Sequence, residues 1–439
     1  MRIALFFFLF LSLFSHAQTS KERDLDTYIR MFSMSALPEL APRKEPLYQL
    51  GLKLFYDKRL SGKNNISCGA CHALGTFSGD GLPLGVGEGA EGIGVKRQQS
   101  QGALLARHTP ALYNLGFPGV TALFWDGRVG LDFYRGGWST PEAGLNGPNP
   151  KLAHIAKTLT SPLAVQALFP ISNPEEMLGQ GSPLNNVEAW DATMDRLLNG
   201  DMKATYNKLF REAFPGVTEF NIGHVGNAIA ELERIHFVAN NTLWDLYLRG
   251  QKQVLSERMK RGAVLYLSKA ACINCHAGPH LTTFGYQNVG IPQIGPGAKN
   301  GDDKGRMEFT GSEEHMYKFR VPPLRNVAFT APYMHTGAFK NMWEVIEHYN
   351  HPMRSLMHFS WDTKHPKYRE DLKLETTQNR KRWETIANTM PRMLNLTQEE
   401  KNDLYCFLMV GLTDIKNQSD LLYKGVLDEI SDCSPRPTL

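Results

Sequence analysis

Two five-residue segments constrain the fold of this 439-residue chain more than any other feature. Both read Cys-x-x-Cys-His, at residues 68–72 and 272–276, and together they contain four of the six cysteines. Residues i and i+3 share one face of a helical turn, so each segment presents two thiols in one direction with an imidazole directly behind them. The two copies are about two hundred residues apart, too far for one small domain. The sequence therefore predicts two separate, largely helical units.

This spacing is typical of covalent haem c attachment, in which two thiols form thioethers with one porphyrin and the histidine binds its iron. The predicted residues are Cys68, Cys71 and His72 for the first haem, and Cys272, Cys275 and His276 for the second. A zinc site would need further Cys or His ligands at finger-like spacing, which these segments lack. A thioredoxin-like pair would not require the trailing histidine. We therefore predict two covalently bound haem c groups.

Residues 1–17 predict that the chain is exported to the periplasm, because a positive start and an apolar run precede the small residue Ala17, as in a secretory signal peptide. Haem c is attached outside the cytoplasm, so this prediction agrees with the two motifs. No later segment is apolar enough to cross a bilayer, and no basic cluster interleaved with aromatic residues supports nucleic-acid binding. In an exported chain Cys406 and Cys433 can form a disulfide, although spacing alone leaves their pairing open.

The predicted fold class is mainly α, with two cytochrome c-like haem domains, long loops and few short strands. We place the signal peptide at 1–17, the first haem domain at 18–240 and the second at 241–439, with a C-terminal tail that could pack back on the first domain. Residues 221–237 have apolar side chains at helical spacing and predict a helix near the domain boundary.

Four other segments complete this picture. Residues 130–150 are rich in Gly and Pro and predict a long loop, and the polar residues 360–383 predict a surface insertion. Thr397 and Glu400 have the spacing of a capping box at the start of an amphipathic helix. The G-x-G-x-x-G pattern within 85–92 lacks the preceding strand and following helix of a dinucleotide site, so it predicts a flexible loop near the first haem.

In the order of its motifs the chain resembles the bacterial di-haem cytochrome c peroxidase family, including its MauG-type branch. The similarity covers nearly all of the mature chain and rests on SCGACH, TPALYN, FWDGR, NPEEM, CINCHAG and PPLRNVAFTAPYMHTGAF. The resemblance implies an enzyme that reduces hydrogen peroxide at its N-terminal haem while its C-terminal haem relays or stores electrons. The electrons would come from a small cytochrome or cupredoxin, or from a protein substrate that is oxidised. The alternative is a di-haem electron-transfer cytochrome without peroxide chemistry.

The resemblance also implies three catalytic residues. The glutamate of the N-P-x-E-M motif is Glu176, which would move a proton between the two oxygens as the O–O bond breaks. Its glutamine partner, in an L-x-x-Q-A context, is Gln166, and Pro170 falls at the family's pocket proline. Trp125 of FWDGR would transfer electrons between the haems. The Gly- and Pro-rich loop between Trp125 and Gln166 departs from the family, so the shape of the pocket is not carried over.

One position suggests that the first haem is open to peroxide. Some family members have a histidine sixteen positions after the proximal one, and it blocks the first haem until the second is reduced. Here Glu88 stands sixteen positions after His72. A carboxylate is a poorer sixth ligand than an imidazole, so we expect an iron site that needs no reductive activation. His108 is the nearest histidine that could still block it, and we expect that residue to be structural.

The distal ligand of the second haem separates the two branches of the family. It lies nineteen positions after the threonine of TAPY, where peroxidases have Met and MauG-type proteins have Tyr. Thr330 leads in this way to Tyr349. A phenolate stabilises ferric or higher iron and so suits the storage of an oxidising equivalent. The alternatives are Met353 or His348 as the ligand, or a core role for Tyr349, which lies on an apolar helical stripe.

The resemblance raises a calcium site as well. Family members hold calcium between the domains through two backbone carbonyls, here those of Thr330 and Pro332, and an asparagine side chain. His108 stands where that asparagine is expected, and Asn114 could substitute for it. Calcium is therefore an open prediction.

Overall fold

The computed structural model describes residues 20–417 apart from 74, 76, 298–301, 360–375, 387–389 and 391–392. The predicted signal peptide, the C-terminal tail and Cys433 lie outside the described residues. Cys406 is disulfide-bonded. Helices dominate the described chain and the strands have two or three residues each, which confirms the mainly α fold class.

The helices of the N-terminal half are α1 (Ser20–Met31), α2 (Glu45–Tyr56), α3 (Cys68–Cys71), α4 (Ala153–Ala156), α5 (Pro162–Gln166), α6 (Phe169–Ser172), α7 (Asn186–Asn199), α8 (Lys203–Ala213) and α9 (Ile222–His236). Those of the C-terminal half are α10 (Leu243–Leu248), α11 (Glu257–Leu267), α12 (Met307–Thr310), α13 (Met342–Asn350), α14 (Pro352–Met357), α16 (Thr376–Glu384) and α17 (Gln398–Cys406). Strands β1 (Ala122–Leu123), β2 (Val129–Leu131) and β3 (Trp138–Ser139) form an antiparallel sheet, and β4 (Tyr286–Gln287) pairs with β5 (Phe319–Arg320).

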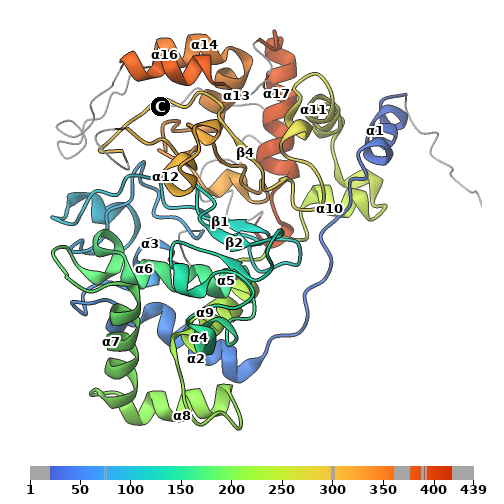
Figure 1. Cartoon of the computed structure of the whole chain (residues 1–439). Coiled ribbons are helices and arrows are strands. Elements are labelled where there is room, and N and C mark those ends of the chain that lie inside the picture. Colours follow the sequence, from blue (N-terminus) through green and yellow to red (C-terminus); the bar gives the residue numbers. More distant parts are fainter. Residues whose placement is uncertain are drawn as a thin grey trace, which may run out of the picture.

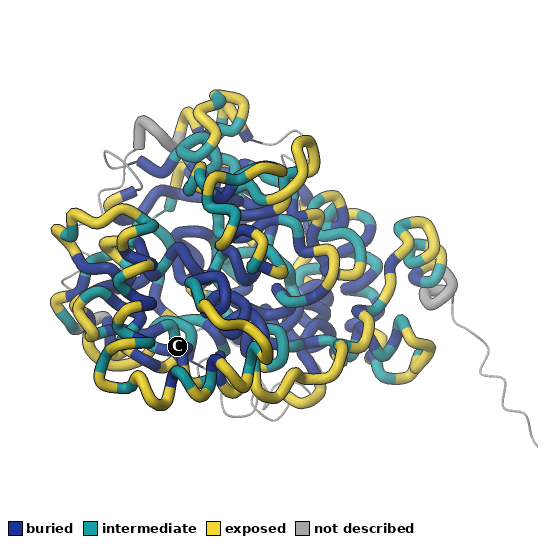
Figure 2. The backbone as a smooth tube through the Cα atoms, turned by 60° about the horizontal axis from the view of Figure 1, so that its bottom comes forward, coloured by how far each residue is buried: buried dark blue, intermediate teal, exposed yellow. Residues whose placement is uncertain are grey.

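The buried apolar side chains form two large clusters, one in each half of the chain. The first is built mainly from α2, α5, α7, α8 and α9, and the second from α10, α11, α13 and α17. Figure 1 shows the first group of helices in the lower part of the molecule and the second in the upper part, with β1 and β2 between them. The buried stretches run through the interior of the molecule and the exposed ones lie around its rim (Figure 2).

Helix α1 belongs to the second cluster although it precedes the first in sequence. Its Leu25 is fully buried there, together with Met34 just beyond the helix, and α1 packs on α11. Figure 1 shows α1 beside α10 and α11, with the chain then running down to α2. The N-terminal segment therefore connects the two clusters.

A close helix crossing organises each cluster. In the first, α2 crosses α9 where a Cβ on Gly51 would lie 2.0 Å from the carbonyl oxygen of Ala228. In the second, α11 crosses α17 where a Cβ on Gly262 would lie 2.1 Å from the carbonyl oxygen of Asp403. The two glycines are needed because any side chain would push the helices apart.

The predicted capping box at the start of α17 is confirmed. The hydroxyl of Thr397 accepts a hydrogen bond from the Glu400 N–H (3.2 Å), and the Glu400 carboxylate accepts one from the Thr397 N–H (2.8 Å). The regular α-helix ends at Cys406, and residues 407–411 continue it as a wider π turn. The predicted helix over residues 221–237 is also present, as α9.

Two loop predictions need adjustment. Residues 130–150 are not wholly irregular, because β2 and β3 pair there and extend the sheet that begins at β1. The predicted surface insertion at 360–383 ends in α16, whose Arg382 is buried rather than exposed. Residues 85–92 contain no helix, and Val86 makes only an isolated bridge with Leu104, as expected of a loop.

Candidate functional site

The first Cys-x-x-Cys-His segment forms a single helical turn, α3, with His72 directly after it. The His72 N–H bonds the Cys68 carbonyl at 2.9 Å, which holds the imidazole against the turn. The ring Nδ1 lies 2.7 Å from the carbonyl oxygen of Ser78. A histidine that donates one ring N–H to a carbonyl keeps the other nitrogen for a metal. This turn therefore fits a haem iron at His72 Nε2.

The second segment repeats this arrangement with a tighter turn. Residues 272–274 form a 3-10 helix after Ala271, which has a left-handed backbone (φ 55°). His276 N–H bonds the Cys272 carbonyl at 2.8 Å, and His276 Nδ1 lies 3.1 Å from the Leu281 carbonyl oxygen. Burial lowers the pKa of His276 to about 4, so its imidazole is neutral, as iron ligation requires. The Cys272 and Cys275 thiols are not in a disulfide.

A large apolar cavity, called the second cavity below, adjoins the second segment. Its walls include Cys272, Cys275, His276 and Tyr349. Tyr349 lines the same cavity as both cysteines, and burial is the main cause that raises the pKa of its phenol well above the usual value. The cavity therefore has a histidine and a tyrosine in its walls beside the attachment cysteines.

Neither alternative to Tyr349 lies in this cavity wall. Met353 is 51 % exposed on α14. His348 is buried, but its Nε2 lies 2.7 Å from the Val289 carbonyl oxygen and its Nδ1 lies 2.9 Å from the Ser355 hydroxyl, so both ring nitrogens have partners. The geometry thus favours Tyr349 among the three candidates.

Glu176 lies in the turn that follows α6, and it is near the first segment. The Asn173 side chain starts this turn by accepting the Glu175 and Glu176 N–H groups, and its amide donates to Glu176 Oε1 at 3.1 Å. Burial raises the pKa of Glu176, and the nearby Arg128 partly opposes this effect. Burial raises the pKa of both Cys68 and Cys71, and the charge of Glu176 makes a small contribution in the same direction. A carboxyl group with a raised pKa beside the attachment cysteines is suited to proton transfer.

Gln166 and Glu88 are the other side chains expected around the first haem. Gln166 ends α5, and within the described residues its side chain makes no hydrogen bond to Glu176. Glu88 is buried, and although burial would raise its pKa, its contacts with Asn65 (2.7 Å) and Lys63 (3.3 Å) hold it below the usual value. Two partners thus hold the Glu88 carboxylate in its ionised form.

Trp125 lines the second cavity, and its indole N–H donates to the carbonyl of His108 at 2.8 Å. Its own carbonyl accepts the N–H of Arg320 at 2.7 Å. His108 Nδ1 lies 2.7 Å from the Leu82 carbonyl oxygen, so one nitrogen of its ring has a partner, and the residue also lines the second cavity.

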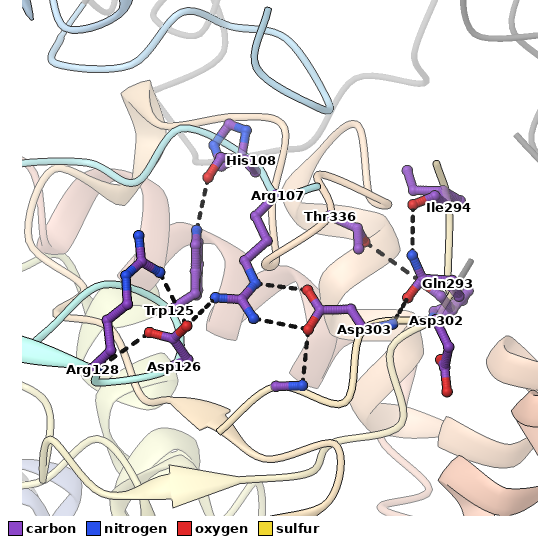
Figure 3. A network of polar contacts seen from close by, with 12 residues as sticks. Arg107, His108, Trp125, Asp126, Arg128, Gln293, Ile294, Asp302, Asp303 and Thr336 are labelled. Carbon is purple, nitrogen blue, oxygen red and sulfur yellow. Dashed lines mark hydrogen bonds and ion pairs between the residues drawn. The ribbon is translucent and has the colours of Figure 1, made fainter. Parts of the chain in front are cut away.

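A buried chain of ion pairs follows Trp125, and our sequence analysis did not predict it. Arg107 joins Asp126 (2.6 Å) to Asp303 (2.6 and 2.9 Å), and Arg128 contacts Asp126 at 3.0 Å (Figure 3). Arg128 also lies 4.0 Å from Glu176. Asp126 and Arg128 belong to FWDGR and could have been suspected from it. Nothing in the sequence around Asp303 points to this role.

Thr330 and Pro332, whose carbonyls the resemblance implies as calcium ligands, line the second cavity, as does His108, which stands where the asparagine ligand is expected. The Ala331–Pro332 peptide bond is cis. Among the described residues no group of three His, Cys, Asp or Glu side chains is arranged to hold a metal. That observation does not test a site built on backbone carbonyls, so calcium stays a prediction.

A mainly helical protein with two Cys-x-x-Cys-His turns on separate apolar cores belongs to the class of di-haem c-type cytochromes. A family model described as di-haem cytochrome c peroxidase matches residues 45–253. Cytochrome c551 peroxidase of Pseudomonas aeruginosa is 30 % identical over 307 residues, which cover 69 % of this chain and 70 % of the relative. The chain belongs to the di-haem cytochrome c peroxidase/MauG family.

Other relatives come from both branches. Methylamine utilization protein MauG of Methylorubrum extorquens is 28 % identical over 316 residues, covering 71 % of this chain and 70 % of the relative. The crystal structure of a MauG-like protein associated with microbial copper homeostasis matches with a TM-score of 0.59 and 26 % identity, over 88 % of this chain and 94 % of that one. The diheme peroxidase BthA of Burkholderia thailandensis, 19 % identical with a TM-score of 0.57 over 92 % and 96 % of the two chains, shares the fold.

Family membership makes the chain a peroxide-dependent oxidoreductase with haem c cofactors. It therefore argues against the alternative of an electron-transfer cytochrome without peroxide chemistry. None of the described helices has the length and apolar character needed to cross a bilayer.

Proposed function

We propose that this chain is an exported, periplasmic enzyme that reduces hydrogen peroxide at a haem on Cys68, Cys71 and His72. Cys272, Cys275, His276 and Tyr349 would hold a second haem, which would store or relay electrons. The proposal rests mainly on residues 124–128, which put Trp125 on the wall of the second cavity and Arg128 beside Glu176. One short segment thus contacts both sites.

A haem held by Cys68, Cys71 and His72 would supply the iron chemistry that cleaves the O–O bond of peroxide. Glu176 accepts the proton of the incoming peroxide and returns it to the leaving oxygen, which departs as water. Burial favours the protonated carboxyl group and Arg128 favours the carboxylate, so both forms are accessible during the reaction. Gln166 helps to position Glu176, and Glu88, held by Lys63 and Asn65, leaves the site open to peroxide.

Two electrons and two protons complete the conversion of peroxide to two waters. Trp125 carries the electrons between the haems, because an indole can be oxidised by one electron and this one lies in the cavity wall. Tyr349 is an anionic oxygen ligand when bound to iron and stabilises its oxidised states. Calcium bound by the carbonyls of Thr330 and Pro332 would order the same wall.

The electron donor is either a small redox protein, such as a cytochrome or cupredoxin, or a protein side chain that is itself oxidised. Tyr349 and Glu88 favour the second, MauG-like reaction. The similarity to a MauG-like protein associated with microbial copper homeostasis is a further reason to test protein substrates first.

The test is to add hydrogen peroxide to the ferric holoprotein and to follow its absorption and EPR spectra. We expect a rapid reaction without prior reduction, and a long-lived two-electron-oxidised state if the enzyme is MauG-like. Glu176→Gln should slow the reaction by roughly 10²- to 10⁴-fold, the usual contribution of a proton-transfer group. Glu175→Gln is the matched control, because this exposed neighbour lies in the same turn.

Three results would contradict the proposal. A protein with fewer than two covalent haems, or with two haems that ignore peroxide, excludes it as a whole. A reaction that requires half-reduction first excludes the open site inferred from Glu88. Equal rates for Glu176→Gln and Glu175→Gln exclude Glu176 as the proton-transfer group.

A further inference from the structure

Two arginines in the wall of the second cavity each have one buried guanidinium nitrogen without a hydrogen-bond partner among the described residues. Arg320 and Arg382 both line the cavity, and each is only 3 % exposed. In each of them Nη1 is buried without a hydrogen-bond partner among the described residues. A buried guanidinium with an unused donor is unfavourable unless an acceptor occupies the adjacent space.

Arg320 has fewer partners than Arg382 within the described residues. Its Nε donates to the Phe124 carbonyl at 2.9 Å and its backbone N–H donates to the Trp125 carbonyl at 2.7 Å, so the residue is fixed in position. No carboxylate forms an ion pair with it in the described part of the chain. Burial lowers the pKa of Arg320 to about 10, which still leaves it positively charged at neutral pH. A charge of this kind calls for an anion.

Arg382 reaches the cavity from α16, at the end of the segment that the sequence suggested was a surface insertion. Its Nη2 donates to Asp302 and to Gln293 Oε1 (3.3 Å), and its guanidinium lies over the ring of Tyr317 at 4.5 Å. These contacts hold the group in one orientation while Nη1 remains unused. Asp302 also accepts the Tyr317 hydroxyl at 2.9 Å, so its charge is shared.

A third arginine of the cavity wall, Arg325, has hydrogen-bond acceptors around its guanidinium group. Arg325 donates to both oxygens of Asp245, at 2.9 and 2.6 Å, and to the Pro279 carbonyl at 2.5 Å. Burial in this wall therefore does not by itself leave an arginine without partners. Arg320 and Arg382 differ because Nη1 of each has no acceptor among the residues that the structure describes.

We propose that Arg320 and Arg382 bind the two propionate carboxylates of the haem in this cavity. Haem carries two carboxylates on one edge, and planar guanidinium groups match carboxylates in both charge and geometry. The inference rests on the proposed function, because it needs a haem attached at Cys272 and Cys275. It also gives the segment containing α16 a role as a wall of the haem site, and through Arg320 it joins one propionate to the backbone of Trp125.

The test is a spectroelectrochemical titration of both haems in the holoprotein, comparing Arg320→Gln and Arg382→Gln with the wild type. Loss of a positive charge beside a propionate favours the oxidised iron, so the reduction potential of the second haem should fall while that of the first stays unchanged. The second haem is identified as the one whose ferric EPR signal changes in Tyr349→Phe. Arg382→Lys keeps the charge and should show a smaller shift.

Arg380→Gln is the matched control, because Arg380 lies on the same helix with its side chain 81 % exposed. Unchanged potentials in both glutamine variants, or a shift of equal size in Arg380→Gln, would overturn the inference. If Arg320→Gln does not fold, Arg382→Gln and Arg382→Lys decide the question. A wild-type protein with only one covalent haem would contradict the proposed function. Two covalent haems whose reduction potentials do not change in the variants would contradict only the assignment of Arg320 and Arg382.

Discussion

At the scale of single residues, the proton transfer that we propose for Glu176 should depend on its contact with Arg128. Burial holds the pKa of Glu176 above its usual value, and Arg128 is the largest influence that lowers it. If Glu176 is the proton acceptor that we propose, it must be ionised to react, so the rate of peroxide reaction should fall as the pH drops through this pKa. Arg128→Gln should raise the pKa further and move the acidic limb of the pH–rate profile to higher pH.

The measurement is the second-order rate constant for peroxide across the pH range. Arg135→Gln is the control, since this exposed arginine lies in the adjacent hairpin and has no contact with Glu176 among the described residues. An acidic limb that stays in place in Arg128→Gln would show that Arg128 does not act on Glu176.

Glu233 provides a second prediction at this scale. Burial raises its pKa to about 8, and its Oε2 has no hydrogen-bond partner within the described residues. The folded protein therefore retains a proton that the unfolded chain releases above about pH 4.3. This contribution to stability is complete below that pH and is lost as the pH rises through the folded-state pKa. Glu233→Gln should flatten the fall in melting temperature between about pH 5 and pH 8.

Glu219→Gln, which changes an exposed carboxylate instead, should keep the pH dependence of the wild type. If Glu233→Gln loses stability with rising pH as steeply as the wild type, the Glu233 carboxyl group is already ionised in the folded protein.

At the scale of helices, the α11–α17 crossing depends on Gly262. Alanine is favoured over glycine inside a helix by about 1 kcal/mol. The new Cβ, however, would lie 2.1 Å from a backbone carbonyl oxygen, and overpacking of this kind costs about 1–3 kcal/mol or more. We therefore expect Gly262→Ala to lower the free energy of unfolding, measured by denaturant titration. Gly75→Ala is the control, because no atom lies within 4 Å of its Cβ position, and a more stable Gly262→Ala would show that the helices separate easily.

At the scale of the whole molecule, Arg107 joins the two halves through Asp126 and Asp303. Burial alone would raise the pKa values of these carboxyl groups, but Arg107 holds both below the usual value. Carboxylates of this kind stabilise the protein above their unfolded pKa, and this contribution is lost as the pH falls through the folded one. Arg107→Met leaves Asp303 buried without its cation and should cost about 3–5 kcal/mol at neutral pH.

Because each half would carry one haem, the unfolding of each half can be followed separately through the absorption of its haem. We expect the absorption changes of the two haems during denaturant unfolding to coincide in the wild type and to separate in Arg107→Met. The control is Lys208→Gln, which breaks an exposed pair with Glu212. Unfolding that stays coincident and unchanged in Arg107→Met would mean that the apolar contacts alone couple the halves.

The sequence by itself predicted the two helical haem turns, the mainly α class, α9 and the cap of α17, because each depends on contacts within a few residues of chain. The family motifs led further, to Glu176, Trp125 and Tyr349. Neither motif nor spacing could show that Arg382 is buried, because its partners Asp302 and Gln293 are about eighty to ninety residues away.

The tertiary structure alone decided which side chains share a cavity. It placed Tyr349 rather than Met353 beside Cys272 and Cys275, and it joined Arg107 to Asp303 across nearly two hundred residues. The sequence determines which groups a short turn presents to a cofactor. Their charged partners arise only when distant segments pack together and exclude water, because only then does a buried charge need an opposite charge beside it.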